Sequence, residues 1–145
     1  MGFMTSDNLP YESSLSINDG LRISTGNAED PLFSPHGGWF VGGFLSNLSG
    51  LRRDSSLAVK WGVHKAGEMR EEPSSSAIEN SLAILISGVF KLQFPGESPT
   101  QVILSERGDY VLFGPGVQHV WTALNNSVIV TIRWHVPSSA ALEGS

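Results

Sequence analysis

The sequence predicts an all-β domain, a barrel or sandwich of short strands, over most of its 145 residues. Short β-prone runs alternate with Gly-, Pro- and Asn-containing turns about every 8–12 residues, a spacing typical of such folds. No long segment with the 3.6-residue period of an amphipathic helix competes with them. Charged residues make up only 16% of the chain and glycines number 16, which suits a compact barrel better than a helical bundle.

The apolar runs begin after Gly38, and each one is bounded by turn residues. In the final run, apolar residues occupy both the odd and the even positions, as expected for a strand that is covered on both faces. The expected strands are Trp39–Val41, Phe44–Leu45, Leu57–His64, Leu82–Ile86, Val89–Phe94, Gln101–Leu104, Tyr110–Phe113, Gln118–Leu124 and Val128–Val136.

Composition divides the chain into three parts. Residues 1–30 are rich in Ser, Asn, Asp and Gly and predict a loose N-terminal arm, within which residues 21–23 could add an edge strand. Residues 31–137 carry the strands and form the predicted barrel, and residues 138–145 form a C-terminal tail.

Charge and composition exclude several functions. The net charge of −5, without a cluster of Lys and Arg, argues against nucleic-acid binding, because phosphate contacts need concentrated positive charge. The absence of cysteine excludes disulfides, thiolate nucleophiles and Cys-ligated metals. No basic stretch followed by an apolar run begins the sequence, and no run reaches the roughly 18 apolar residues of a membrane span. We therefore expect a soluble, cytoplasmic protein that does not bind membranes.

Two stretches resemble the motifs of a known family. Gly108–His119 is similar to the second cupin motif, in which a Gly-Asp turn leads into a buried strand, a Pro- and Gly-containing turn and an inward-facing His. Ile84–Leu92, with Gly88 at a tight turn, resembles the hairpin that ends the first cupin motif. Together the matches cover roughly residues 57–136. The resemblance implies a single cupin barrel, a double-stranded β-helix or jelly roll, with a flexible N-terminal arm.

The wider pattern is similar to a group of small bacterial cupins, some of which carry the label "signal peptidase I". It comprises Trp61–His64, Ala66–Arg70, the Gly108 block and Ile132–Trp134. A signal peptidase of that type needs a membrane anchor and a Ser/Lys pair, and the sequence shows no anchor. The peptidase interpretation is therefore set aside.

The cupin resemblance also implies where a metal would be held, and the usual ligands are missing. Standard cupins use two His and one Glu from the first motif and one His from the second. The first-motif His positions fall at Ser74–Ala77, and the Glu position is Ser81. Only the second-motif ligand, His119, is present. The standard motif thus predicts no metal; a tentative nonstandard set is His119, His64, Glu68 and Glu79.

The candidate catalytic residues are His119 and His64. By the resemblance, His119 faces the barrel interior, as an acid/base group, a metal ligand or a buried His satisfied by hydrogen bonds. His64 ends an expected strand, and either reaches His119 as a partner or lies on the surface. The candidate ligand-binding residues are Trp61, Arg70, Trp121 and Arg133. Each has an ordinary alternative: core packing for the tryptophans, and a surface ion pair or outward orientation for the arginines.

Three functions remain open at this point. The first is a metal-independent acid/base enzyme of isomerase, epimerase or lyase type, in which His119 and His64 transfer protons to and from a small molecule. The second is an enzyme with a reduced site for a divalent transition metal, because two His and one carboxylate suffice for non-haem iron. The third is a domain that binds or senses a metabolite without chemistry. A homodimer is also conceivable, because cupins often pair.

Overall fold

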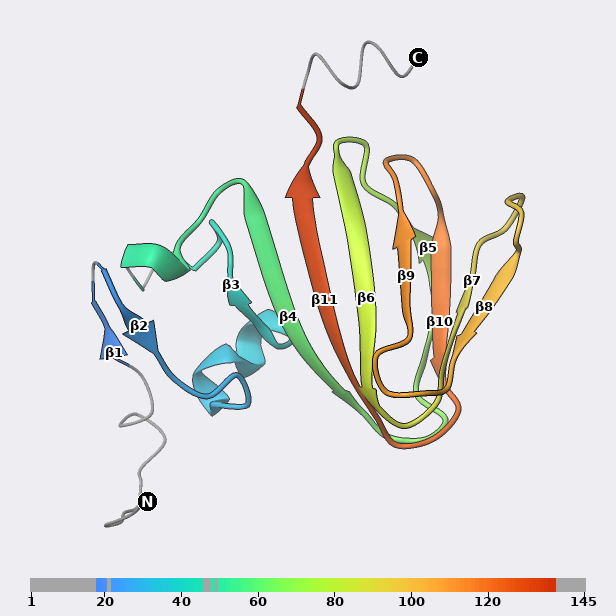
Figure 1. Cartoon of the computed structure of the whole chain (residues 1–145), viewed down its shortest axis with the longest axis horizontal. Coiled ribbons are helices and arrows are strands. Elements are labelled where there is room, and N and C mark those ends of the chain that lie inside the picture. The colour runs from blue at the N-terminus through green and yellow to red at the C-terminus, as the bar shows by residue number, and fades with distance from the viewer. Residues whose placement is uncertain (1–17, 21, 46–47, 49, 138–145) are drawn as a thin grey trace. The chain divides into compact units, whose positions relative to one another are not determined.

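The structure, a computed structural model, describes residues 18–20, 22–45, 48 and 50–137 (Figure 1). Most of the predicted N-terminal arm and the predicted tail at 138–145 lie outside these residues. The chain divides into two compact units, one within residues 1–60 and one within residues 61–145. None of the described helices is long and apolar enough to cross a membrane.

The first unit is built from short elements. A strand pair, β1 (Asn18–Asp19) and β2 (Ser24–Thr25), precedes the 3-10 helix η2 (Pro31–His36). The strand β3 (Trp39–Val41) pairs with the first half of β4 (Leu57–His64), in which Trp39 lies opposite Lys60. A second 3-10 turn, η3, spans Gly50–Arg52. Residues 22–23 of the edge strand expected at 21–23 form no strand, and residue 21 lies outside the described residues. The expected strand Phe44–Leu45 is not formed.

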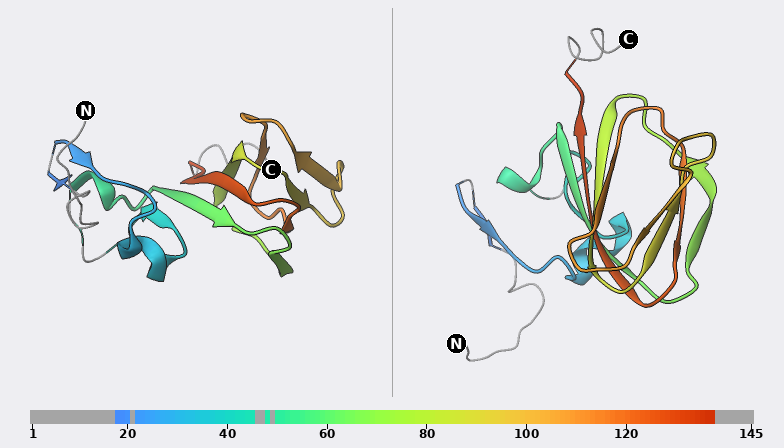
Figure 2. Two further views of the ribbon diagram at one scale, coloured as in Figure 1. Left: turned by 90° about the horizontal axis from the view of Figure 1, so that it is seen from below. Right: turned by 45° about the vertical axis from the view of Figure 1, so that its right-hand side comes forward.

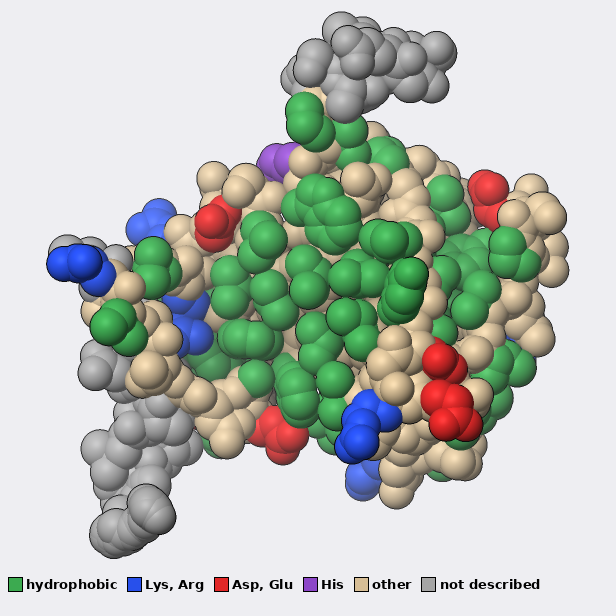
Figure 3. Space-filling model, viewed as in Figure 1, with side chains coloured by type: hydrophobic (Ala, Val, Ile, Leu, Met, Phe, Trp, Pro, Cys, Tyr) green, Lys and Arg blue, Asp and Glu red, His purple; other side chains and the backbone are tan. Residues whose placement is uncertain are grey.

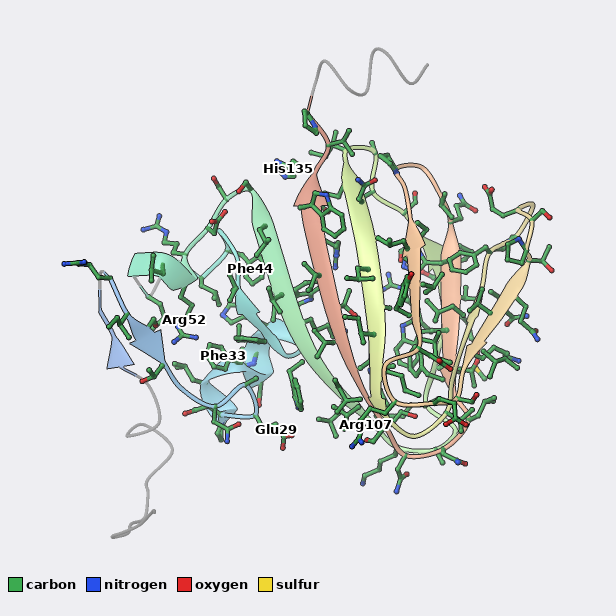
Figure 4. The ribbon with its side chains drawn as sticks, viewed as in Figure 1. Glu29, Phe33, Phe44, Arg52, Arg107 and His135 are labelled. Carbon is green, nitrogen blue, oxygen red and sulfur yellow. The ribbon has the colours of Figure 1, made fainter. Side chains whose placement is uncertain are left out.

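The buried Arg52 holds parts of this unit together (Figure 4). Its Nη2 donates a hydrogen bond of 2.8 Å to the Ser24 Oγ, and its Nη1 donates to the Phe40 carbonyl at 3.4 Å. Its Cζ also lies 5.5 Å from the ring centroid of Phe33, within the range of a cation–π contact. These contacts compensate the cost of burying a guanidinium, so Arg52 is assigned a structural role.

The second unit consists of two antiparallel sheets (Figure 2). From β4 onward the first sheet has the order β4-β11-β6-β9, and the second has the order β5-β10-β7-β8. Short turns connect most of the strands, as is usual for antiparallel barrels. The strands are β5 (Met69–Ser74), β6 (Glu79–Ser87), β7 (Phe90–Gln93), β8 (Gln101–Leu104), β9 (Tyr110–Phe113), β10 (His119–Ala123) and β11 (Ser127–His135).

A single apolar core lies between these two sheets. Alternate residues of each strand point into it, because the side-chain period of a strand is two. On β6, for example, Ala83 and Leu85 are buried while Leu82 and Ile84 are only partly buried. The buried cluster comprises Ala83, Leu85, Phe90, Leu92, Phe94, Leu104, Ala123 and Ile129. The all-β barrel predicted from the sequence is confirmed.

Gly88 forms the tight turn between β6 and β7 with a φ of +93°. A Cβ added there would come within 2.7 Å of the Ser127 Cα, so the position is closed to any larger residue.

The Gly108–Asp109 turn before β9 is stabilised in a different way. The Asp109 carboxylate accepts backbone N–H bonds from Ser105 at 3.1 Å and Glu106 at 2.9 Å, which fixes the approach to the strand.

Candidate functional site

The strand register decides which side chains share the face of β6 and β11 that looks into the core, here called the inner face. Ile129 lies opposite Leu85 in the β11–β6 pair, and both are buried. Four residues along β11, Arg133 lies opposite Ser81, so it shares the parity of Ile129. The sequence left open whether Arg133 lines the interior or points outward; the register assigns it to the inner face.

Arg133 has a carboxylate neighbour on the same face. Its Nη1 lies 3.7 Å from the Glu79 Oε1, and the other carboxylate oxygen lies 3.7 Å from the His135 Nε2. The Arg133 side chain retains 40% exposure while that of Glu79 retains only 19%. The inner face of β11 therefore ends in a charged group that is still open to solvent.

His119 lies on the opposite sheet, on the inner face of β10. It pairs in register with Ser74 of β5, and its Nε2 lies 3.4 Å from the Ser74 Oγ. Its Nδ1 lies 3.4 Å from the Val117 carbonyl oxygen. The Phe113 ring, which reaches the same interior from β9, has its centroid 4.7 Å from that of His119. One imidazole is thus held by a hydroxyl, a carbonyl and an aromatic ring.

These neighbours favour one form of the imidazole. A carbonyl oxygen only accepts hydrogen bonds, so the Nδ1 must carry the proton, and the neutral ring then has its lone pair on Nε2, facing Ser74. Burial lowers the pKa of His119 below 6.5, opposed by the Val117 carbonyl and reinforced by the positive charges of Arg133 and Arg70. His119 is consequently a neutral base at physiological pH.

Arg70 joins this site from β5. It lies opposite Trp121 in the β5–β10 pair, and its charge acts on His119. Its Nε donates a hydrogen bond of 3.1 Å to the Glu72 carbonyl, which fixes the base of the side chain. Two arginines from different sheets therefore place positive potential around one neutral imidazole.

The His64 ring approaches the inner face of β10 at a point two residues along from His119. Two residues span about 7 Å along a strand. Its ring centroid lies 4.4 Å from that of Trp121 and 5.5 Å from that of Phe90. Its Nδ1 lies 3.2 Å from the Glu68 Oε1. The ring folds back over Gly62, where an added Cβ would approach the Nε2 to 2.9 Å. The two candidate histidines therefore come from different sheets, and His64 approaches from β4 the strand that carries His119.

Trp61 lies elsewhere. It precedes Gly62, and adjacent residues of a strand point to opposite faces, so its side chain is on the face of β4 away from His64. Trp121 differs, because its ring stacks on the core residue Phe90 with centroids 5.3 Å apart. Of the two tryptophans considered for ligand binding, the structure places only Trp121 on the inner face.

The positions of the missing cupin ligands test whether a metal would fit. Ser74 stands beside His119, where a first-motif His would lie, and the buried Ser81 lies on the inner face opposite Arg133. Neutral hydroxyls beside an arginine are poor substitutes for imidazole and carboxylate ligands. Across residues 18–137 as far as described, no three His, Asp or Glu side chains group so as to hold a metal ion. The residues at the usual cupin ligand positions therefore do not fit a metal.

An apolar hollow of about 230 Å³ adjoins the His119 site. It shares Phe113 and Val117 with that site, since both residues contact His119. Such a hollow can hold the apolar part of a small molecule whose polar end is bound nearby. Its other lining residues include the apolar Phe94, Pro99, Val102 and Val111 and the polar Glu97 and Ser98.

Sequence reasoning missed Val117 and Phe113 as neighbours of His119, and it considered Ser74 only as the position of an absent metal ligand. Ser74 ends a strand, Met69–Ser74, whose charged residues and Pro73 carry no β signal. Phe113 and Val117 were read only as parts of a strand and a turn. The parity of Tyr110–Phe113 does place Phe113 and Val111 on one face, which is the signal that could have identified the ring.

Comparisons with known proteins show similarity in structure alone. No protein-family model matches the sequence, and no curated protein matches it either.

Solved structures, two of which are described as cupins, match the fold. A cupin protein from Bacteroides fragilis is 17% identical, with a TM-score of 0.52 over 64% of this chain and 74% of that one. A cupin superfamily protein from Desulfitobacterium hafniense is 12% identical, with a TM-score of 0.51 over 59% and 73%. A conserved protein from Streptococcus pyogenes is 15% identical, with a TM-score of 0.51 over 61% and 72%. The chain therefore has the fold of the small cupin proteins.

Proposed function

We propose that this protein is a small-molecule-binding cupin that acts on an anionic ligand by metal-independent acid/base chemistry at His119. The observation that carries the proposal is the setting of His119: a partly buried, neutral imidazole whose Nε2 lies beside Ser74, with Arg133 and Arg70 acting on it. A base with a pKa below neutrality is unprotonated when substrate arrives.

The ligand class follows from the two arginines. A guanidinium binds a carboxylate or phosphate through two parallel hydrogen bonds. Arg133 and Arg70 approach the site from opposite sheets, so the anionic end of a ligand would lie between them while its apolar part enters the hollow beside Phe113. Negative charge arriving there would offset the positive potential that lowers the His119 pKa.

The chemistry is a proton transfer. In its neutral form His119 accepts a proton from the ligand at Nε2, while the arginines stabilise the negative charge that develops next to the carboxylate. Returning the proton to another atom or face gives an isomerase or epimerase, and loss of a leaving group gives a lyase. His64, oriented by the Glu68 carboxylate, is the second acid/base group of the proposal.

The test is a thermal-shift screen with matched sets of carboxylates, phosphates and neutral analogues. Wild type, Arg133→Gln and His119→Gln are compared, and the compounds that bind are incubated with protein and followed by NMR. Anions should stabilise wild type and lose most of that effect in Arg133→Gln. His119→Gln should bind but not convert them. Preference for neutral compounds would overturn the ligand class, and binding without conversion would indicate a sensing domain.

Elemental analysis separates this proposal from a reduced metal site. Protein purified without a metal-affinity column is compared with His119→Ala after both are incubated with iron, manganese, nickel or zinc. We expect neither to retain metal near stoichiometry, because hydroxyls replace the ligands at Ser74 and Ser81. Stoichiometric metal in wild type that is lost in the variant would favour the nonstandard site instead.

A further inference from the structure

A second hollow lies within the first unit and shares no lining residue with the His119 site. Its volume is about 500 Å³, inside the range of ~300–1,000 Å³ that is usual for small-molecule sites. Three parts of the unit form its walls: β2 with the residues that follow it, β3 and η3. Residues 24–28 line one side, and Phe40, Val41, Leu51 and Arg52 line the rest.

Arg52 gives this hollow a positive charge. A guanidinium is always charged in proteins, so this charge is permanent. Among the described residues that line the hollow with it there is no Asp, Glu, Lys or His. In the space-filling view, a Lys or Arg group is visible at the place where Figure 4 labels Arg52, with hydrophobic side chains beside it (Figure 3). A concave surface whose lining charge is positive concentrates anions.

The guanidinium is held in place before any ligand arrives. Arg52 is only 7% exposed, and its Nη2 donates a hydrogen bond of 2.8 Å to the Ser24 Oγ. Its Cζ lies over the ring of the buried Phe33, and that ring meets the Phe40 ring edge to face with centroids 6.0 Å apart. A ligand therefore does not have to immobilise a long flexible side chain, which would otherwise reduce its affinity.

Two contacts of Arg52 can be exchanged for stronger ones with an anion. Its Nη1 lies 3.4 Å from the Phe40 carbonyl oxygen, and its Nη2 lies 3.4 Å from the Thr25 carbonyl oxygen. These are long hydrogen bonds to neutral acceptors, whereas a carboxylate accepts charge-assisted bonds of about 2.8 Å that are roughly twice as strong. Both nitrogens belong to one planar fork, so a single carboxylate can bind both of them.

We propose that this hollow binds a small monocarboxylate, with its carboxylate on Arg52 and its apolar part against Phe40 and Leu51. One positive charge balances one carboxylate, whereas a phosphate group carries about −1.5 to −2 and would leave surplus negative charge beside apolar side chains. Leu51 is 56% exposed, so an alkyl or aromatic group that covers it removes apolar surface of both from water. The inference does not depend on the chemistry proposed for His119.

The test is a ¹H–¹⁵N NMR titration of the full chain with butyrate and benzoate, and with butyramide and benzamide as neutral probes of the same shape. At millimolar concentrations the carboxylates should shift the backbone amide signals of Gly26, Asn27 and Val41 and the Nε–H signal of Arg52, while the amides should not. Arg133→Gln should show the same shifts as wild type, because Arg133 belongs to the His119 site.

A charge placed in the wall of the hollow at Leu51 leaves the contacts of Arg52 in place. Leu51→Glu should weaken the binding of butyrate about tenfold, and Leu51→Lys should strengthen it, because each adds a charge close to the bound carboxylate. The matched control is Leu32→Glu, which makes the same charge change at a 48%-exposed residue of η2 that does not line the hollow. It should bind butyrate as wild type does.

Four outcomes would overturn the proposal. Wild-type signals of Gly26, Asn27 and Val41 that no carboxylate shifts would mean that the hollow binds none. Amides that shift them as strongly would exclude an anionic ligand, and inorganic phosphate that binds more tightly than butyrate would exclude a monocarboxylate. Shifts that disappear in Arg133→Gln would assign the ligand to the His119 site. The comparison of carboxylate with amide needs only wild type, so it decides the matter even if Leu51→Glu does not fold.

Discussion

The Nε2 of His119 lies 3.4 Å from the Oγ of Ser74, across the β10–β5 pair. In the cupin motif that the sequence resembles, Ser74 falls at a position expected to supply a metal-binding His. Here a hydroxyl takes that place and the positive charge near His119 comes from arginines instead. The interior at this point therefore carries a neutral imidazole beside a hydroxyl, with the charges of two arginines acting on it.

The first prediction concerns the pH dependence of stability. Burial, with Arg133 and Arg70, lowers the folded-state pKa of His119 below 6.5, so in mildly acidic solution the unfolded chain binds more protons than the folded one. The free energy of unfolding should hence be fully present above about pH 6.5 and fall as the pH decreases toward the folded pKa.

Urea denaturation of wild type and Arg133→Gln at a series of pH values checks this. Removing the cation should reduce the acid loss of stability. A variant that loses stability in acid as steeply as wild type would show that Arg133 has no influence on His119.

The second prediction concerns Gly88. Its φ of +93° and the nearby Ser127 backbone leave no room for a Cβ, so Gly88→Ala should lower the free energy of unfolding by roughly 3–5 kcal/mol. Gly96→Ala is the matched control, because Gly96 has a φ of +81° and nothing within 4 Å of an added Cβ. Its cost should be only the left-handed backbone penalty, about 1–2 kcal/mol. Equal losses in the two variants would contradict the close approach at Gly88.

The third prediction separates packing from chemistry at His64. His64→Ala removes a ring that lies 4.4 Å from Trp121 and should cost about 1–3 kcal/mol of stability. His64→Phe keeps an aromatic ring there and should restore most of that loss. Urea denaturation followed by tryptophan fluorescence measures both. If His64→Phe is as unstable as the alanine variant, the interaction with Glu68 rather than the ring contact holds this position.

The fourth prediction concerns Asp109. Backbone N–H bonds from Glu106 and then Ser105 lower the pKa of its carboxyl below 3.8. The stabilisation is therefore present above about pH 3.8 and is lost as the pH falls through the lower folded pKa. Asp109→Asn should melt earlier than wild type at neutral pH, and the difference should shrink in strong acid. A difference in melting temperature that is constant across this range would rule out the carboxylate as its source.

Much of the fold could be predicted because local sequence patterns indicate most of its strands and turns. The alternation of apolar and polar residues, bounded by Gly or Pro turns, predicted β4, β8 and β9 with their observed bounds. The Gly108–Asp109 turn indicated the start of the strand that follows it. β5 could not be found this way, since its Met-Arg-Glu-Glu-Pro-Ser sequence is charged and contains a proline. It pairs with β10 alone within its sheet, and that long-range pairing has no local signal.

The site was less accessible than the fold for the same reason. His119 stood out through a motif, but the orientation of Arg133 depends on its register with Ser81, which a single strand does not specify. The contact of His119 with Ser74 joins residues 45 positions apart in the chain. Whether Trp61 and Trp121 share a face likewise depends on two strands, and the structure separates them.

The most direct test of the central claim is a long-range ¹H–¹⁵N NMR titration of the His119 imidazole. At neutral pH the spectrum should show the tautomer with the proton on Nδ1, and the ring should titrate with a midpoint below 6.5 that moves upward in Arg133→Gln. A proton on Nε2 at neutral pH, or a midpoint at or above 6.5 in wild type, would contradict the account of His119 as a neutral base facing an anionic ligand.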